Sequence, residues 1–262
     1  MSENILEINN LSKYFGGLAA VSDCSLNVKR GTITGIIGPN GSGKTTLFNL
    51  IAGNLKSSSG NVTFDEENIT DVPSYELFSK GLLRTFQIAH EFTNLSVLEN
   101  LMMVPGNQSG EKIMTALFKP NLVAQEEAII KDKAKEVVDF LNLGHLSNEL
   151  AGNLSGGQKK LLELGRTMMV DAKLVLLDEV GAGVNRTLLK DLGTAIEKLN
   201  KEKGYTFCMI EHDMDFIGRL CDPVIVMAEG SVLFEGSVEE AKKDEKVIES
   251  YLGRGSKLKD KN

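Results

Sequence analysis

The stretch TITGIIGPNGSGKTTLFNLIAG, residues 32–53, decides the fold. It begins as an apolar strand, passes through a glycine-rich turn and continues as a helix, which Gly53 can close just after the last turn. Residues 38–45, GPNGSGKT, have the G-x-x-x-x-G-K-T spacing of a phosphate-binding loop, here called the phosphate loop. A strand, this loop and a helix in that order predict a parallel α/β core with a phosphate site at the edge of its sheet.

The residue types of the phosphate loop suit a nucleotide. Glycines permit backbone N–H groups to point inward at phosphates, and the helix that follows presents its positive end. Lys44 supplies a charge for the β and γ phosphates, and Thr45 offers a hydroxyl to Mg²⁺. The plain alternative is a glycine-rich turn that only caps a helix, and the flanking elements argue against it. The expected nucleotide contacts are Gly38, Pro39, Asn40, Gly41, Ser42, Gly43, Lys44, Thr45 and Thr46.

The sequence before the phosphate loop predicts strands, and the sequence after the first helix of the core predicts mainly further helices. Residues 4–36 alternate like short strands around a Gly16-Gly17 turn, which predicts an antiparallel edge. Residues 73–87 indicate a short helix and then a strand. Residues 88–165 are typical of helices, with apolar residues at Ile129, Ile130, Ala134, Val137, Val138 and Leu141. This pattern predicts a helical lobe inserted into the core.

The carboxyl-terminal part returns to alternating strands and helices. The expected order is the strand KLVLLDE (173–179), a helix (186–204), the strand YTFCMIEH (205–212) and a hairpin (223–236). The hairpin should turn at Glu229-Gly230, and a last helix should start at Ser237 with Glu240 as its capping-box partner. Residues 253–262 are expected to form a flexible polar tail.

Polar side chains follow three of the expected parallel strands. In LVLLDE, four apolar residues run into Asp178 and Glu179, here called the acidic pair, as in a strand buried on both faces. Asp178 is expected to hold Mg²⁺, mainly through water, and Glu179 to deprotonate the water that attacks a γ-phosphate. Gln87 and His212 end two other strands, so these groups should meet where the phosphates lie. Alone, each would be a solvated turn, a surface amide or a hydrogen-bonded neutral ring, and the phosphate loop favours the functional interpretation.

Composition argues against several classes of protein. A net charge of −7 over 262 residues gives no general attraction to nucleic acid. The longest apolar runs, such as residues 174–177 and 224–228, are too short to cross a bilayer, and the amino terminus has no signal pattern. The three cysteines fit neither a disulfide framework nor a metal site, so Cys24, Cys208 and Cys221 are expected to be buried thiols. These features predict a folded protein of the cytosol.

Taken together, the motifs resemble the ATP-binding subunit of an ABC transporter over the whole chain apart from the tail. Six motifs stand in the family's order: Phe15 after Lys13 (the A-loop), GPNGSGKT, Gln87 (the Q-loop), LSGGQ at residues 154–158 (the signature), LVLLDE and His212 (the switch histidine). The resemblance implies an α/β P-loop NTPase fold, with a RecA-like core, an antiparallel β edge subdomain and an inserted helical subdomain. The implied ABC ATPase domain spans residues 1–252, with the core and β edge at 1–87 and 166–252 and the helical subdomain at 88–165.

The resemblance also implies ATP hydrolysis in a head-to-tail dimer, with roles at matching positions. The catalytic residues would be Glu179 as general base, His212 at the γ-phosphate and Lys44; the metal ligands would be Thr45, Gln87 and Asp178. Phe15 would stack on adenine, although the sequence alone equally allows a core aromatic at this position. ATP and Mg²⁺ are thus the implied substrate and metal.

The signature is a second candidate anion site. Ser155 can cap the helix that follows and leave the amides of Gly156 and Gly157 free for an anion. A helix N-terminus contributes up to ~2 kcal/mol, which alone corresponds to a dissociation constant of roughly 30 mM. It therefore cannot be an independent nucleotide site. The resemblance implies that Leu154, Ser155, Gly156, Gly157 and Gln158 complete the ATP site of a partner chain, and a plain Ser-capped helix is the alternative.

Within the family, the resemblance is nearest to the branched-chain amino acid import ATPases of the LivG type. It rests on RTFQ with the following NLSVLENLMM, the extra stretch PGNQSGEKIMTALFKPNLVAQEE, GAGVN after the acidic pair, and KVIESYLG near the end. Urea and amide importers and the lipopolysaccharide-export ATPase are similar and stay open as alternatives. The soluble iron–sulfur assembly ATPase is an alternative from another class.

The resemblance implies protein partners rather than nucleic acid. They are a second ABC ATPase chain, identical or related, membrane permease subunits and, indirectly, a periplasmic solute-binding protein. The chain would lie peripherally at the cytoplasmic face of the inner membrane, with residues 88–104 as the contact surface for the permease. The alternative for the Leu and Met residues of this segment is the core of the helical lobe.

Two positions depart from the family's pattern. Val180 stands where the family usually has Pro after the catalytic Glu, and Asn185 stands where it often has Asp. Loss of the proline can loosen the turn that orients Glu179. Loss of the carboxylate can alter communication across the dimer. Hydrolysis is still expected.

Overall fold

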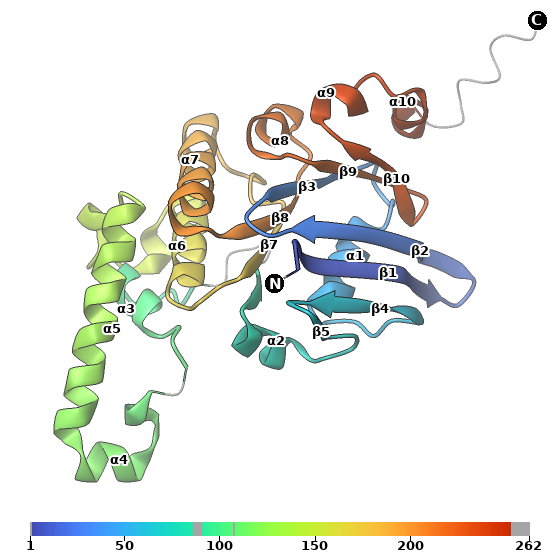
Figure 1. The fold of residues 1–262 in the computed structure, drawn as a ribbon. Helices are drawn as coiled ribbons and strands as arrows, with labels where there is room; N and C mark the ends of the chain where they lie inside the picture. The colour runs from blue at the N-terminus through green and yellow to red at the C-terminus, as the bar shows by residue number, and fades with distance from the viewer. Residues whose placement is uncertain (1, 86–90, 107, 253–262) are drawn as a thin grey trace, which may run out of the picture. The chain divides into compact units, whose positions relative to one another are not determined.

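The computed structural model describes residues 2–85, 91–106 and 108–252 (Figure 1). The chain divides into two compact units. The first comprises residues 1–84, 173–181 and 197–262, and the second comprises residues 85–172 and 182–196. The expected helical subdomain, residues 88–165, falls inside the second unit, whose bounds are wider, and the subdomain bounds stay a prediction. The expected tail, residues 253–262, lies outside the described residues.

The first unit contains a four-stranded antiparallel sheet in the order β2-β1-β4-β5. Its strands are β1 (Asn4–Phe15), β2 (Leu18–Lys29), β4 (Ser59–Phe64) and β5 (Glu67–Asn68). β1 and β2 pair across the Gly16-Gly17 turn, which confirms the antiparallel edge. Each of these two strands is 12 residues long, so the expectation of short strands is wrong there.

A six-stranded sheet of the same unit has the order β10-β9-β3-β8-β7-β6. Its strands are β3 (Ile33–Ile37), β6 (Leu82–Arg84), β7 (Leu174–Asp178), β8 (Thr206–Ile210), β9 (Val224–Ala228) and β10 (Ser231–Gly236). All neighbours pair in parallel except β10, which forms the predicted hairpin with β9. β3, β7 and β8 are buried at every position, which explains why their sequences are apolar runs instead of alternating patterns.

Helix α1 (Lys44–Ile51) contributes to a buried core that also takes residues from both sheets. The shared core takes alternate residues of the parallel strands, because successive side chains of a strand point to opposite faces. These residues include Ile36, Leu174, Leu176, Cys208, Ile210, Ile225 and Met227, and they join Leu47, Phe48 and Ile51 of α1. Gly53 follows the C-cap Ala52 with a φ of 68°, as predicted for the position that closes α1. This packing fixes the phosphate loop between β3 and α1.

The first unit also contains the helices α2 (Ser74–Lys80), α8 (Met214–Leu220), α9 (Val238–Ala241) and α10 (Glu245–Leu252). Ser237 caps α9 in a capping box with Glu240, as predicted. The expectation of one last helix is wrong, because α9 ends after four residues and α10 follows. Asp244 accepts a hydrogen bond from the Val247 N–H at 3.0 Å, so its side chain caps the start of the second helix.

The second unit is helical. It contains α3 (Val97–Met102), α4 (Ile113–Phe118), α5 (Pro120–Phe140), α6 (Gly156–Met168) and the 3-10 turns η1 (Ser109–Glu111), η2 (Gly144–Leu146) and η3 (Ala151–Asn153). α7 (Arg186–Lys203) begins in this unit and ends in the first. Among the described residues, no helix has both the length and the apolar character of a membrane span.

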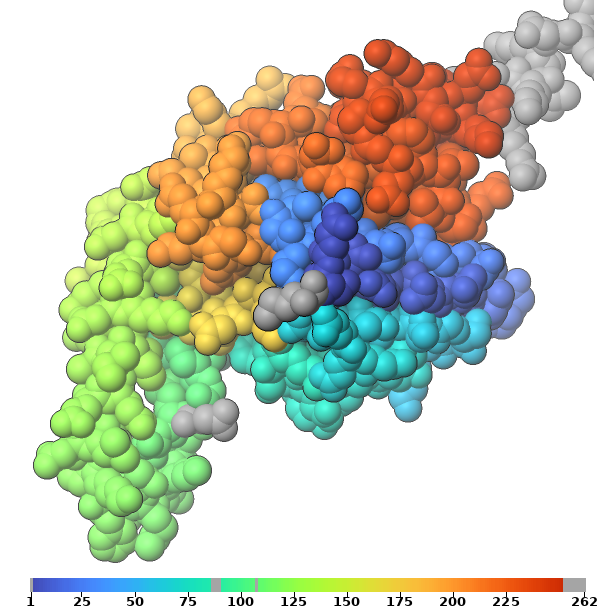
Figure 2. Space-filling model, in the orientation of Figure 1, coloured from blue at the N-terminus to red at the C-terminus, as the bar shows by residue number. Residues whose placement is uncertain are grey.

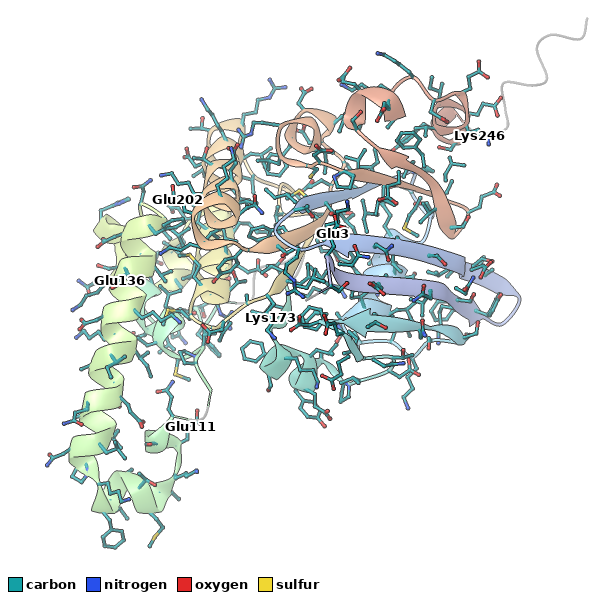
Figure 3. All side chains as sticks on the ribbon, viewed as in Figure 1. Glu3, Glu111, Glu136, Lys173, Glu202 and Lys246 are labelled. Atoms are coloured by element: carbon teal, nitrogen blue, oxygen red, sulfur yellow. The ribbon has the colours of Figure 1, made fainter. Side chains whose placement is uncertain are left out.

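The predicted apolar face of α5 is buried only in its second half. Ala134, Val137 and Val138 are buried, and Glu136 lies on the exposed side of the helix (Figure 3). Ile129, in contrast, is 69% exposed. The first half of α5 belongs to the part of this unit that projects with α4 in Figure 2, where it has less structure to pack against. The apolar spacing therefore predicted the helix correctly, and the structure adds that only its second half is buried.

Candidate functional site

The ammonium group of Lys44 is hydrogen-bonded within the phosphate loop and also lies in the field of the acidic pair. Lys44 is the first residue of α1, and its Nζ donates to the carbonyl oxygens of Gly38 at 2.8 Å and Pro39 at 3.0 Å. Burial lowers the pKa of the Lys44 ammonium, while the Glu179 and Asp178 carboxylates raise it. The structure thus brings together the loop lysine and both carboxylates, as the order of strands predicts.

Two glycines of the loop are required both by its backbone conformation and by its packing. Gly38 has a φ of 149° and Gly43 a φ of 100°, where L side chains rarely fit. A Cβ at Gly38 would overlap the carbonyl oxygen of Met227, and one at Gly43 would overlap that of Ala20. The loop therefore packs closely against two other backbone segments of the same chain, at Met227 and at Ala20. The arrangement fits a cradle whose amides are available to phosphates.

Asp178 ends β7 as half of a buried ion pair. Its Oδ2 accepts a hydrogen bond from Arg84 Nη2 at 2.7 Å, with 8% of the Asp178 side chain and 10% of the Arg84 side chain exposed. Arg84 also donates from Nη1 to Asn49 Oδ1 at 2.6 Å. Sequence reasoning missed Arg84. The available signal was a single cation at the end of β6, the strand that pairs with β7.

Glu179 and His212 lie in direct contact. His212 follows β8 by two residues, and its Nε2 is 3.0 Å from Oε1 of Glu179. Glu179 has a φ of 48°, a left-handed conformation that is unusual for a residue with a side chain. The two residues named as base and switch histidine therefore come together at the carboxyl edge of neighbouring strands β7 and β8. Their roles stay a prediction.

Glu211, beside His212, is a site residue that sequence reasoning missed. It is 5% exposed, and its Oε1 accepts a hydrogen bond from the Gly181 N–H at 2.7 Å. Burial raises the pKa of this carboxyl, and the backbone N–H groups of Gly181 and His212 lower it. The signal in the sequence was a charged residue at the end of an apolar strand run.

Tyr251 of α10 also reaches the phosphate loop and was missed. Burial raises the pKa of its hydroxyl, and a hydrogen bond with the backbone of Gly38 lowers it. Its side chain is still half-exposed. No pattern near residue 251 connects it to a loop more than two hundred positions earlier, so only the fold reveals this contact.

Phe15 lies at the end of β1 with 50% of its surface exposed, so it is not a core aromatic. The Nζ of Lys13 lies 5.3 Å from the centre of its ring. An exposed ring in the same unit as the phosphate loop is compatible with stacking on a base. Gln87, named as a metal ligand, lies outside the described residues.

The signature forms the start of α6 in the second unit. Ser155 is the N-cap, and its Oγ accepts from the Gln158 N–H at 3.4 Å. Gln158 Oε1 accepts in return from the Ser155 N–H at 2.9 Å, which completes a capping box. The N–H groups of Gly156 and Gly157 stand in the first turn, where a helix offers no internal acceptor. The residues Leu154, Ser155, Gly156, Gly157 and Gln158 thus form a helix end suited to an anion.

The two signature glycines have different surroundings, which leads to a prediction. A Cβ at Gly157 would lie 2.7 Å from Cβ of Leu188, whereas the nearest atom to a Cβ at Gly156 is the Gly183 carbonyl oxygen at 3.8 Å. We expect Gly157→Ala to lower the free energy of unfolding by about 1–3 kcal/mol through overpacking. Gly156→Ala, the matched control, should leave it within about 0.5 kcal/mol. Urea denaturation of both variants measures this, and equal stabilities would contradict the prediction.

Comparison with known proteins gives three kinds of likeness. The sequence pattern of a family described as ABC transporter matches residues 21–182. A protein of Archaeoglobus fulgidus described as probable branched-chain amino acid transport ATP-binding protein LivG is 43% identical over 249 residues, 95% of either chain. The high-affinity branched-chain amino acid transport ATP-binding protein BraF of Pseudomonas aeruginosa is 35% identical over 253 residues, which are 97% of this chain and 99% of BraF.

Solved structures agree with these relatives. A nucleotide-free ATP-binding cassette from an ABC transporter superposes with a TM-score of 0.82 at 39% identity, covering 95% of this chain and 99% of that one. The ADP conformation of another ABC transporter cassette gives a TM-score of 0.81 at 38% identity, covering 96% and 100%. A dimeric bacterial ABC transporter cassette gives a TM-score of 0.71 at 25% identity, covering 89% and 98%.

Proposed function

This chain belongs to the ABC transporter family as an ATP-binding subunit that hydrolyses ATP, and from that premise we propose that it powers the import of branched-chain amino acids. The predicted RecA-like P-loop NTPase fold agrees with the cassettes that it superposes on. The proposal for the solute is supported by two relatives, 35% and 43% identical to this chain, that are described as branched-chain amino acid transport ATP-binding proteins. It would place the chain at the cytoplasmic face of the inner membrane, bound to permease subunits.

In the proposed mechanism, the phosphate loop binds ATP and Glu179 acts on water. Lys44 adds a positive charge at the phosphates, close to the acidic pair. Glu179 accepts a proton from the attacking water, and His212, 3.0 Å away, orients the carboxylate and contacts the γ-phosphate. The contact between Glu179 and His212 is the observation that carries the catalytic part of this proposal.

The residues present also fit Mg²⁺. Thr45 is an exposed residue in the first turn of α1, and the Asp178 carboxylate lies close enough to Lys44 to raise the pKa of its ammonium. Hydroxyl and carboxylate oxygens are the ligands that this hard cation prefers. When bound, the ion would neutralise charge that develops on the phosphate oxygens. Thr45, Asp178 and Gln87 are the proposed ligands.

The signature supports a dimer of ATP-binding chains. Its helix end can contribute up to ~2 kcal/mol to an anion, so it needs a site whose affinity comes from elsewhere. We propose that this is the γ-phosphate on the phosphate loop of a second chain, identical or related. A cassette that forms a dimer is among the similar structures, which supports this proposal. ATP would then join the two chains, and hydrolysis would release them.

The proposed permease contact lies on the second unit. Of the segment 88–104, Val97 and Leu101 are buried in the unit, whereas Phe92 and Met103 are exposed. Residues 88–90 lie outside the described residues. α4 adds more apolar surface, because Ile113, Met114, Leu117 and Phe118 are all exposed. Exposed apolar side chains grouped on one short helix favour a protein contact.

Co-purification tests the proposed function. A tagged chain extracted with the membranes of its own cells should bring down permease subunits. In vesicles containing that complex, a periplasmic binding protein loaded with leucine, isoleucine or valine should stimulate ATP hydrolysis. If only urea or amides stimulate hydrolysis, the chain serves a urea or amide importer instead. If the complex exports lipopolysaccharide, the proposed direction of transport is wrong. Recovery of soluble scaffold proteins without any permease would overturn the transport proposal in favour of iron–sulfur assembly.

A further inference from the structure

The turn that carries Glu179 needs support from its surroundings. Glu179 has a φ of 48°, where a side chain is strained. A strained backbone of this kind persists only when neighbouring groups over-determine it. Val180 follows, and its side chain does not fix the backbone as a proline ring would. The left-handed geometry of the turn must therefore come from contacts elsewhere.

Two hydrogen bonds supply such contacts, one on each side of Val180. The Glu179 N–H donates to the carbonyl oxygen of Ile210 at 2.9 Å. The Gly181 N–H donates to Oε1 of Glu211 at 2.7 Å. Val180 itself is buried between them, at 4% exposure. The turn is thus fastened to the end of β8 by one backbone acceptor and one carboxylate.

The same carboxylate also touches the segment that carries His212. Oε2 of Glu211 accepts a hydrogen bond from the His212 N–H at 3.3 Å. His212 in turn contacts the Glu179 carboxylate through Nε2. Glu211 therefore closes a ring of contacts that runs from Gly181 through Glu179 and His212. A buried carboxylate is costly to desolvate unless hydrogen bonds compensate it, so its place here needs an explanation.

We propose that Glu211 is a positioning residue that sets the geometry between Glu179 and His212. The inference rests on the proposed role of Glu179 as general base. Glu211 does not itself contact water or phosphate in this role. It keeps the Gly181 amide and the His212 amide at fixed positions, so the Glu179 carboxylate and the imidazole stay within contact. Charge-assisted hydrogen bonds suit this task, because they are shorter and stronger than neutral ones.

Steady-state kinetics of the full chain test this inference. Glu211→Met removes the acceptor at similar length, and we expect kcat to fall roughly 10- to 100-fold with KM for ATP unchanged, as for a misplaced catalytic group. In a Glu179→Gln background the same change should lower the residual rate by less than about twofold, because residues that act as a unit are non-additive. A purely structural role would lower the rate in both backgrounds and raise KM.

Glu211→Gln keeps an oxygen that can face Gly181 but loses the charge. We expect kcat between those of the wild type and Glu211→Met, and roughly tenfold faster hydrogen exchange at the Gly181 amide. If Glu211→Met does not fold, Glu211→Gln is the deciding variant. A Glu211→Gln protein with wild-type kcat and wild-type hydrogen exchange at the Gly181 amide overturns the inference. If Glu179→Gln loses activity and neither Glu211 variant does, the inference about Glu211 is overturned and the assignment of Glu179 as the base stands. Full activity of Glu179→Gln overturns the base assignment and this inference together.

Discussion

Replacing Glu179 with Gln is expected to lower the turnover of ATP by about 10² to 10⁴, the usual contribution of a general base. The amide cannot accept the proton of the attacking water, while it keeps the size of the carboxylate. ATP binding should persist, because the phosphate loop and Lys44 are unchanged. The variant should therefore accumulate as an ATP-bound dimer, measured by light scattering and by single-turnover hydrolysis.

Glu66→Gln is the matched control for this prediction. Glu66 also has a left-handed φ, of 70°, but it lies in the turn between β4 and β5. It should keep wild-type turnover, which separates the loss of the base from any general effect of Gln in a left-handed turn. Unchanged hydrolysis in Glu179→Gln would remove Glu179 from its assigned role.

Ser155→Arg is expected to abolish hydrolysis while leaving ATP binding to the isolated chain nearly intact. The change removes the cap of α6 and places a long side chain at the exposed helix end. The lost cap costs about 1 kcal/mol, so the fold should survive. The helix end would contribute at most ~2 kcal/mol to an anion, and it would do so in the partner's site. Equilibrium titration with ATP and a turnover assay measure the two effects separately.

Ser237→Arg provides a control with the same cap. Ser237 Oγ accepts from the Glu240 N–H at 3.3 Å, and Glu240 Oε2 accepts from the Ser237 N–H at 2.8 Å, as in the signature. This variant loses a comparable cap outside the signature and should hydrolyse ATP normally. A large loss of ATP affinity in isolated Ser155→Arg would show that the signature acts within its own chain.

Local patterns predicted most elements of the first unit. The apolar runs at β7 and β8 gave fully buried parallel strands, and the Glu229-Gly230 turn gave the β9–β10 hairpin. The residues of the phosphate loop and the acidic pair were predictable for the same reason: each motif is contiguous in sequence. The roles assigned to them stay predictions.

Long-range contacts account for what the sequence could not provide. Arg84 gains its meaning only because β6 pairs with β7, beside Asp178. Tyr251 is hydrogen-bonded to the backbone of Gly38, although the two residues are far apart in the sequence. The absence of a proline at residue 180 indicated a loose turn, yet the Glu211 carboxylate binds the next amide. The apolar spacing of α5 likewise could not show that the first half of this helix has few packing partners and that Ile129 is therefore exposed.

Mixing two inactive variants tests most directly whether ATP is hydrolysed in a site shared by two chains. Ser155→Arg keeps the phosphate loop, and Lys44→Ala keeps the signature, so a mixed dimer has one complete site. If the chains exchange freely and the sites act independently, an equimolar mixture should recover up to about a quarter of wild-type hydrolysis, since half of the dimers are mixed and each has one of two sites intact. A mixture no more active than the sum of its components would contradict the account.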